Sequence, residues 1–211
     1  MPPDLFELPV AVVSGHSAVA VPRLPHAPPF RLLDRVLHVD LQQGTLWAQK
    51  QVTANDALWP AEQSLLPIAP QTLPSLLLIE ALSQAAACFN LLSSQQPTHS
   101  HSPAPSTQSS IGPPHHLGFL VSVSDFRFPE AEEGAASVGD TVLLHVQKQE
   151  SLGALVAFSA QALCPISPTS QARASDVPRG GAVLAPSATD VGGRQARALG
   201  QGRLLFAVTS K

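Results

Sequence analysis

The sequence is poor in charge and in cysteine. Of its 211 residues 13% are charged, and 12 Lys and Arg against 15 Asp and Glu give a formal net charge of −3. This composition provides no basic surface for a nucleic acid and no polybasic patch for a membrane. The two cysteines, Cys88 and Cys164, lie in apolar runs, so they are expected to be small buried side chains rather than a disulfide framework.

Targeting, membrane and cofactor signals are also missing. The first residues lack the basic start and long apolar run of a signal peptide, and no run reaches the roughly 20 apolar residues of a membrane span. We therefore expect a cytoplasmic protein without a membrane span. There is no Gly-rich phosphate loop and no G-x-S-x-G elbow. The histidines near residue 100 and at 115–116 lie in or beside a Ser/Pro-rich run, where a rigid set of metal ligands is not expected. The sequence thus predicts no cofactor and no metal site.

The 21 prolines cluster, and two segments are of low complexity. Residues 93–116 and 165–202 are rich in Ser, Pro, Gln, Gly and Ala and have little to bury, so both are expected to be mobile insertions. Residues 1–22 read as an N-terminal extension. The domain prediction is one domain over residues 23–209, interrupted by these two insertions.

The remaining pattern predicts one long helix and five or six strands. Strands are expected at about 35–40, 45–53, 117–128, 139–150, 154–164 and 203–210, because apolar residues recur there between turn signals. Residues 72–92 are apolar on every side, which indicates a central helix with Thr72 or Ser75 as its N-cap. The fold class is therefore α+β, with an antiparallel sheet curled around one helix. A second copy would cover the rest of the helix, so a dimer is expected.

The predicted helix carries one ionisable residue in its middle. In "LLLIEALSQAAA", residues 76–87, Glu80 is surrounded by apolar side chains. A carboxyl group that loses its hydration there becomes suited to general acid or base work. Gln84 lies one turn further on and could hydrogen-bond Glu80 along the same face. The alternative is a Glu on a helix edge that reaches solvent or a basic partner.

The histidines outside the low-complexity segments give a weaker signal. His26, in "LPHAPPF", lies in a Pro-rich turn, and its role there is expected to be structural. His38 and His145 lie within predicted strands and are expected to be surface or satisfied core residues.

The pieces together resemble a known family. "LPHAPPFRLLDRVLHVD", "QVTAN", "LPSLLLIEALSQAAA", "GFLVSVSDFRFPE" and "VGDTVLLHVQ" follow one another as they do in the β-hydroxyacyl-acyl carrier protein dehydratases of fatty-acid synthesis, which are hotdog-fold proteins. The resemblance covers about residues 23–164 and extends to a last strand at 202–209. It implies a curved sheet around the helix and edge-to-edge pairing of two protomers, as a homodimer or as a heterodimer with a related subunit.

The resemblance also implies a site. A helix carboxylate works with a histidine of the other subunit on a 3-hydroxyacyl thioester of an acyl carrier protein or coenzyme A, in a tunnel at the dimer interface. Glu80 falls on the family's carboxylate, with Gln84 beside it. Backbone N–H groups near Ser75 are implied to polarise the thioester carbonyl. Gly118 and Phe119 match a segment that lines the acyl tunnel.

One departure from the family pattern concerns the histidine. The family carries it shortly before the central helix, whereas residues 56–74 of this chain contain none, and Glu62 falls near its place. Three hypotheses follow. The chain is a divergent dehydratase whose base is Glu62 or a histidine from elsewhere, a hotdog acyl thioesterase that uses a lone carboxylate, or a catalytically inactive subunit that binds acyl chains or pairs with an active dehydratase.

Overall fold

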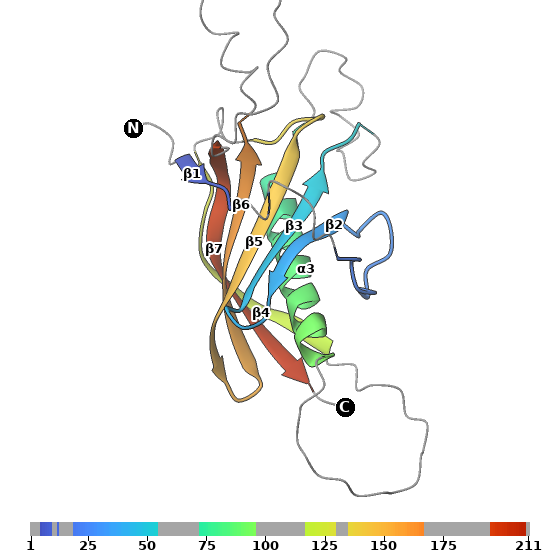
Figure 1. Ribbon diagram of the computed structural model, residues 1–211, viewed down its shortest axis with the longest axis vertical. Coiled ribbons are helices and arrows are strands. Elements are labelled where there is room, and N and C mark those ends of the chain that lie inside the picture. The colour runs from blue at the N-terminus through green and yellow to red at the C-terminus, as the bar shows by residue number, and fades with distance from the viewer. Residues whose placement is uncertain are drawn as a thin grey trace, which may run out of the picture.

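Seven strands and one long helix make up the part of the chain that the computed structural model describes, residues 5–9, 12, 19–54, 72–95, 117–129, 135–166 and 195–209 (Figure 1). The elements are β1 (Leu5–Glu7), β2 (Arg35–Asp40), β3 (Thr45–Gln51), α3 (Ser75–Ser94), β4 (Leu117–Arg127), β5 (Thr141–Leu152), β6 (Leu155–Pro165) and β7 (Gln195–Thr209).

The strands form one antiparallel sheet in the order β1-β7-β6-β5-β3-β2, and β4 also pairs with β7. The curved sheet lies against α3 (Figure 1). Strands β5, β6 and β7 follow one another in the chain and are also neighbours in the sheet. Helix α3 lies between β3 and β4 in the chain, and these two strands do not pair. The predicted α+β class and the hotdog arrangement of a sheet around one helix are confirmed.

The core fills the space between the inner face of the sheet and α3. Along β6 the side chains of Val156, Phe158 and Ala160 are buried at every second position, as expected for a strand with one covered face. Phe158 makes edge-to-face contacts with Phe89 of α3 and Phe206 of β7, each with ring centroids 5.8 Å apart. The helix is thereby held against the middle of the sheet.

Helix α3 begins without a side-chain cap. Its N-cap is Pro74, and the predicted capping role of Thr72 or Ser75 is wrong. The reason is that Thr72 is extended and forms a bridge with Ser137, while Ser75 is already the first helical residue. The helix is long and apolar enough to cross a membrane by length and composition, but half of that stretch is buried within this fold.

Strand β7 corrects the boundary of the second predicted insertion. Residues 195–202 pair with β6, so the insertion does not extend to residue 202. Their Gly/Ala composition suggests low complexity, but the glycines are needed for the close approach of Phe126 to the strand. A Cβ on Gly202 would lie 2.4 Å from Cδ2 of Phe126, and one on Gly200 would lie 3.0 Å from its Cε1. The first predicted insertion also begins too early, because α3 continues to Ser94.

Part of the predicted N-terminal extension belongs to the sheet. Strand β1 pairs with the start of β7, and the buried side chains of Leu8 and Val12 join a second apolar cluster. This cluster lies on the outer face of the sheet, which α3 does not cover, and includes Trp47 and Leu163.

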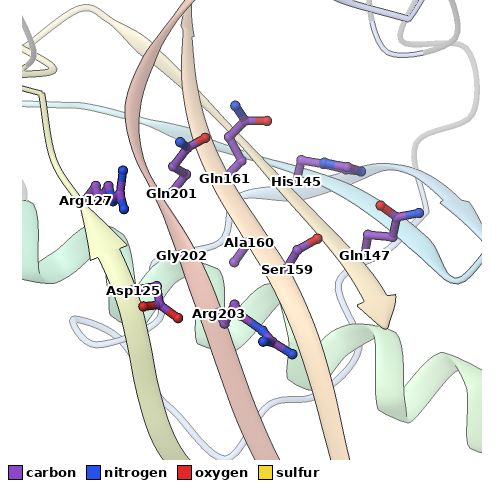
Figure 2. Close-up of a pocket in the computed structure, with 10 residues that line it drawn as sticks. All are labelled: Asp125, Arg127, His145, Gln147, Ser159, Ala160, Gln161, Gln201, Gly202 and Arg203. Atoms are coloured by element: carbon purple, nitrogen blue, oxygen red, sulfur yellow. The ribbon is translucent and has the colours of Figure 1, made fainter. Parts of the chain in front are cut away.

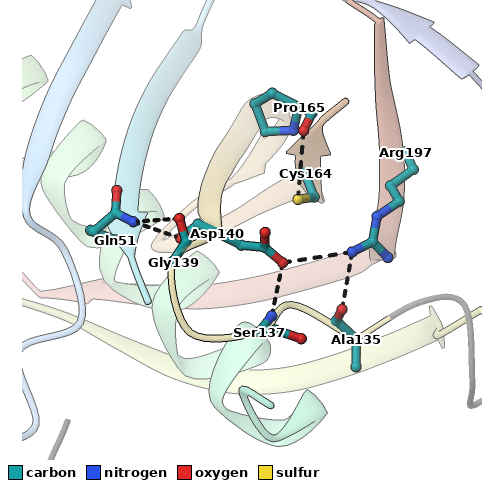
Figure 3. Close-up of polar contacts among 8 residues, drawn as sticks. All are labelled: Gln51, Ala135, Ser137, Gly139, Asp140, Cys164, Pro165 and Arg197. Carbon is teal, nitrogen blue, oxygen red and sulfur yellow. Dashed lines mark hydrogen bonds and ion pairs between the residues drawn. The ribbon is translucent and has the colours of Figure 1, made fainter. Parts of the chain in front are cut away.

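A set of polar contacts fixes the turn before β5 and, through it, the start of α3 (Figure 3). Arg197 of β7 donates to the carbonyl of Ala135 at 3.0 Å and lies 3.8 Å from the carboxylate of Asp140. The same carboxylate accepts from the backbone N–H of Ser137 at 2.9 Å. Leu73 donates its backbone N–H to Ala136 at 2.7 Å, so the residue two before the helix is tied to this turn.

Cys88 and Cys164 are free and buried, as expected. Burial raises the pKa of the Cys88 thiol to about 12, with Arg31 acting in the opposite direction. In the unfolded chain this thiol ionises near pH 8.5, roughly its ordinary value. The folded state therefore retains the proton at alkaline pH while the unfolded state loses it, and the free energy of unfolding falls as pH rises.

We therefore expect the contribution of Cys88 to be constant below about pH 8.5 and to decline by up to about 1.4 kcal/mol per pH unit towards pH 12. The measurement is urea unfolding of the wild type and of Cys88→Ala between pH 8 and 11. The variant should show a shallower decline. Equal slopes for the two proteins would show that the thiol is not protected from ionisation.

Candidate active site

A cavity of about 350 Å³ lies between α3, β4 and the end of β7. Its walls are mostly apolar, and its polar groups come from α3 and from the Pro-rich segment before β2. The lining residues are Pro25, His26, Glu80, Ser83, Gln84, Ala87, Leu91, Gly118, Phe119, Leu120 and Phe206. A cavity of this size and lining is typical of a small-molecule site.

Glu80 lies on the wall of this cavity but is not fully buried. Its side chain is 39% exposed, because it is on the helix face that turns from the sheet toward the opening. The neighbouring Ala81 and Leu82 are buried in the core. The expectation of a carboxyl enclosed in apolar surroundings is therefore wrong in degree, although the carboxyl does border a cavity.

Gln84 holds Glu80 in place. Its Nε2 donates to Oε1 of Glu80 at 2.8 Å, so the hydrogen bond expected from the one-turn spacing is present. The same amide donates to the carbonyl of Phe30 at 2.7 Å and accepts from the backbone N–H of Leu32 at 2.9 Å. Gln84 is 1% exposed, and both of its amide hydrogens and its oxygen have partners. It thus joins Glu80 to the Pro-rich segment.

His26 is the functional candidate that the sequence reasoning missed. Its Nε2 lies 3.5 Å from Oε1 of Glu80, slightly beyond hydrogen-bonding distance, and its side chain is half exposed at the same cavity. The segment that carries it is folded back by a turn in which Phe30 donates its N–H to Ala27 at 2.9 Å. His26 comes from the same chain as Glu80, whereas the resemblance implied a histidine from the other subunit.

The other predicted residues divide into two groups. Gly118 and Phe119 of β4 line the cavity, as expected of an acyl-binding segment. Ser75 is exposed at the first turn of α3 and is not among the residues that line the cavity. Glu62 lies outside the described residues. Within the described ranges, no group of three or more His, Cys, Asp and Glu side chains is arranged to hold a metal ion.

Part of the chain is similar to known proteins. Residues 24–111, which include β2, β3 and α3 with both His26 and Glu80, match the family model of the FabA-like domain. Over 62 residues the chain is 47% identical to the 3-hydroxyacyl-[acyl-carrier-protein] dehydratase FabZ of Protochlamydia amoebophila, covering 29% of this chain and 38% of that protein. Over 95 residues it is 36% identical to FabZ of Xylella fastidiosa, covering 45% and 54%.

A solved structure supports the fold over nearly the whole chain. The dehydratase heterocomplex ApeI:P from Xenorhabdus doucetiae superposes with a TM-score of 0.53 and 16% identity, covering 92% of this chain and 93% of that one. The chain spans 38% to 54% of the length of these FabZ relatives. It is therefore a hotdog-fold protein whose residues 24–111 are similar to the FabA-like domain and which resembles the FabZ 3-hydroxyacyl-[acyl-carrier-protein] dehydratases over part of its length.

Proposed function

We propose that the protein dehydrates a 3-hydroxyacyl thioester in fatty-acid or polyketide-type lipid synthesis, with His26 and Glu80 as its acid–base pair. The observation that carries this proposal is the 3.5 Å approach of His26 to Glu80 on the wall of a largely apolar cavity. The similarity to FabZ supports the reaction class, and the residues that match the FabA-like domain, 24–111, include both side chains.

In the proposed reaction the two side chains divide the elimination of water between them. The neutral imidazole of His26 removes a proton from C2 of the substrate, and the released electron pair forms the C2–C3 double bond. The C3–O bond breaks, and the protonated Glu80 carboxyl donates its proton to the departing hydroxyl. The products are water and an enoyl thioester. Because the proton and the hydroxyl leave from adjacent carbons, two groups this close to one another can serve both.

The hydrogen-bond pattern supports different proposed roles for the two oxygens of Glu80. Oε1 accepts from Gln84 and is the oxygen nearest His26. Oε2 is then the atom that carries the proton for the leaving hydroxyl. After the reaction His26 holds the proton taken from C2, and its proximity to the carboxylate allows the proton to return. Neither step of this proposal calls on Glu62, which lies outside the described residues.

The cavity suits a substrate whose acyl chain is attached to a carrier. Leu91, Leu120 and Phe206 give the inner cavity an apolar wall for the chain, while Gly118 and Phe119 form its β4 side. The thioester then lies near Glu80, and the carrier, an acyl carrier protein or coenzyme A, extends outside. For the thioester carbonyl, the helix start at Ser75 remains a proposed source of polarising N–H groups.

The proposal is tested by identifying the products. Purified protein is incubated with 3-hydroxyacyl thioesters of acyl carrier protein and of coenzyme A, and the products are separated by mass. Loss of 18 mass units with the thioester intact supports dehydration. Release of free thiol would instead support the thioesterase hypothesis. No product, with activity restored by a related hotdog subunit, would support the inactive-partner hypothesis.

We further propose that two chains pair through β4. This strand has a hydrogen-bonded neighbour on one side, β7, and it exposes apolar side chains, among them Phe119 at 58% and Val121 at 57%. An exposed edge strand with apolar side chains is a template for pairing with another strand. The cavity borders the same strand, so pairing would help to enclose the substrate.

Val121→Lys is expected to yield a monomer at micromolar concentration, because a lysine on an edge strand opposes strand addition. Val121 lies at a register shift between β4 and β7, so the substitution spares the existing ladder. Sedimentation velocity is the measurement, and Leu152→Lys is the control, since Leu152 is 81% exposed at the β5–β6 turn. A wild-type protein that is itself monomeric would favour a heterodimer.

A further inference from the structure

A second concave surface lies on the outer face of the sheet, opposite the cavity described above (Figure 2). Ser159 and Gln161 point to it and alternate along β6 with Phe158 and Ala160, whose side chains are buried on the inner face. Its volume is about 450 Å³, within the range of small-ligand sites. We call it the outer groove and define it by Asp125, Arg127, His145, Gln161, Gln201 and Arg203.

The strand register brings polar side chains from four strands into two rows. Arg127 of β4 lies opposite Gln201 of β7, which lies opposite Gln161 of β6. Gln161 in turn lies opposite His145 of β5. In the second row, Arg203 lies opposite Ser159, which lies opposite Gln147. Figure 2 shows these side chains around a centre formed by Ala160 and Gly202.

The charges of the outer groove favour an anion. Arg127 and Arg203 make no side-chain hydrogen bond or ion pair with any described residue, and the side chains of Gln161 and Gln201 are also without such partners there. Among the described residues that line the groove, Asp125 is the one acid. Two guanidinium groups against one carboxylate give a local excess of positive charge in a chain whose formal net charge is −3.

Two residues of the outer groove are held in defined conformations. His145 stacks on Trp47, with ring centroids 4.3 Å apart, and desolvation lowers its pKa, which favours the neutral imidazole. Asp125 has a φ of 54°, an uncommon backbone conformation for a residue with a side chain. It lies within a register shift of β4. Such conformations are concentrated at ligand sites and switch regions.

We propose that the outer groove binds a small phosphate ester, with the phosphate between Arg127 and Arg203 and the hydroxyl or amine groups of the ligand on Asp125 and the glutamine amides. A phosphate presents three oxygens and can accept from both guanidinium groups at once, whereas a planar carboxylate pairs best with one. Asp125 repels a ligand that is anionic throughout, so the rest of the ligand must supply hydrogen-bond donors.

The test is isothermal titration of the full chain at low ionic strength with ribose 5-phosphate, inorganic phosphate and ribose as probes. Arg127→Gln and Arg203→Gln each remove one guanidinium group. Both residues are exposed, so the substitutions should leave the fold intact. Lys148→Gln is the matched control, since it removes an exposed positive charge from β5 outside the groove. Glu80→Gln should bind as the wild type does, because Glu80 is on α3, which covers the other face of the sheet, and it does not line the outer groove.

The expected result is saturable binding of ribose 5-phosphate that either arginine variant weakens about tenfold or more and that Lys148→Gln leaves unchanged. Inorganic phosphate should bind more weakly than the ester, and ribose should not bind. The proposal is overturned if no binding saturates, or if Lys148→Gln weakens binding as much as the arginine variants. Equal affinity for inorganic phosphate and the ester would overturn the assignment of an ester.

Discussion

Glu80→Gln is expected to lower the dehydration rate by about 10²–10⁴-fold, the contribution of a positioned acid or base. Glutamine has the shape of glutamate but cannot donate a carboxyl proton to the departing hydroxyl. The side chain is partly exposed at the cavity, so the fold should tolerate the change. The measurement is the rate of enoyl-thioester formation at saturating substrate, together with thermal unfolding to confirm a native protein.

His26→Gln is the companion variant, and His38→Gln is its control, since His38 lies in β2 outside the cavity. Because the two groups act in one elimination, the double variant Glu80→Gln/His26→Gln should be little slower than either single variant. Rates close to wild type for His26→Gln would show that the base lies elsewhere. Activity of Glu80→Gln close to wild type would remove Glu80 from the mechanism.

Gln84→Leu is expected to lower the free energy of unfolding by about 3 kcal/mol. The substitution leaves the buried backbone N–H of Leu32 and the part-buried carbonyl of Phe30 without their partner, and a buried group left unpaired costs about 1–3 kcal/mol. It also releases Glu80 from its hydrogen bond, so activity should fall as well. Urea unfolding and the dehydration assay measure the two effects.

Gln84→Glu separates these effects. A carboxylate can still accept from Leu32, but it cannot donate to Phe30 or to Glu80, and it places a like charge beside Glu80. We expect this variant to lose most of its activity even under conditions where it is folded. A Gln84→Leu protein as stable as the wild type would mean that the Pro-rich segment is held to α3 by other contacts.

Local patterns predicted much of the fold. Alternating apolar residues located β2 and β3, and the apolar run around Glu80 located α3, since both depend on spacing within one segment. The Glu80–Gln84 hydrogen bond was predictable for the same reason. The start of β7 was not, because its Gly and Ala residues are explained by Phe126 and its neighbours on another strand, which a single segment does not reveal.

The candidate site was predictable only in part, because half of it depends on tertiary packing. The sequence identified Glu80 from its apolar neighbours, but it gave His26 no signal beyond a Pro-rich turn. That turn reaches the carboxyl through the hydrogen bonds that Gln84 makes to Phe30 and Leu32. The outer groove likewise depends on the register of four strands. Its two arginines are far apart in the sequence, but they lie in the two neighbouring rows of side chains on the sheet.

The origin of His26 and Glu80 in one polypeptide has a consequence for stoichiometry. If each subunit contains its own complete pair, the two halves of a dimer do not complement one another. A mixed population of intact and Glu80→Gln chains would then lose turnover in linear proportion to the altered fraction. A heterodimer with a silent partner would retain one working centre per assembly, supplied entirely by this chain.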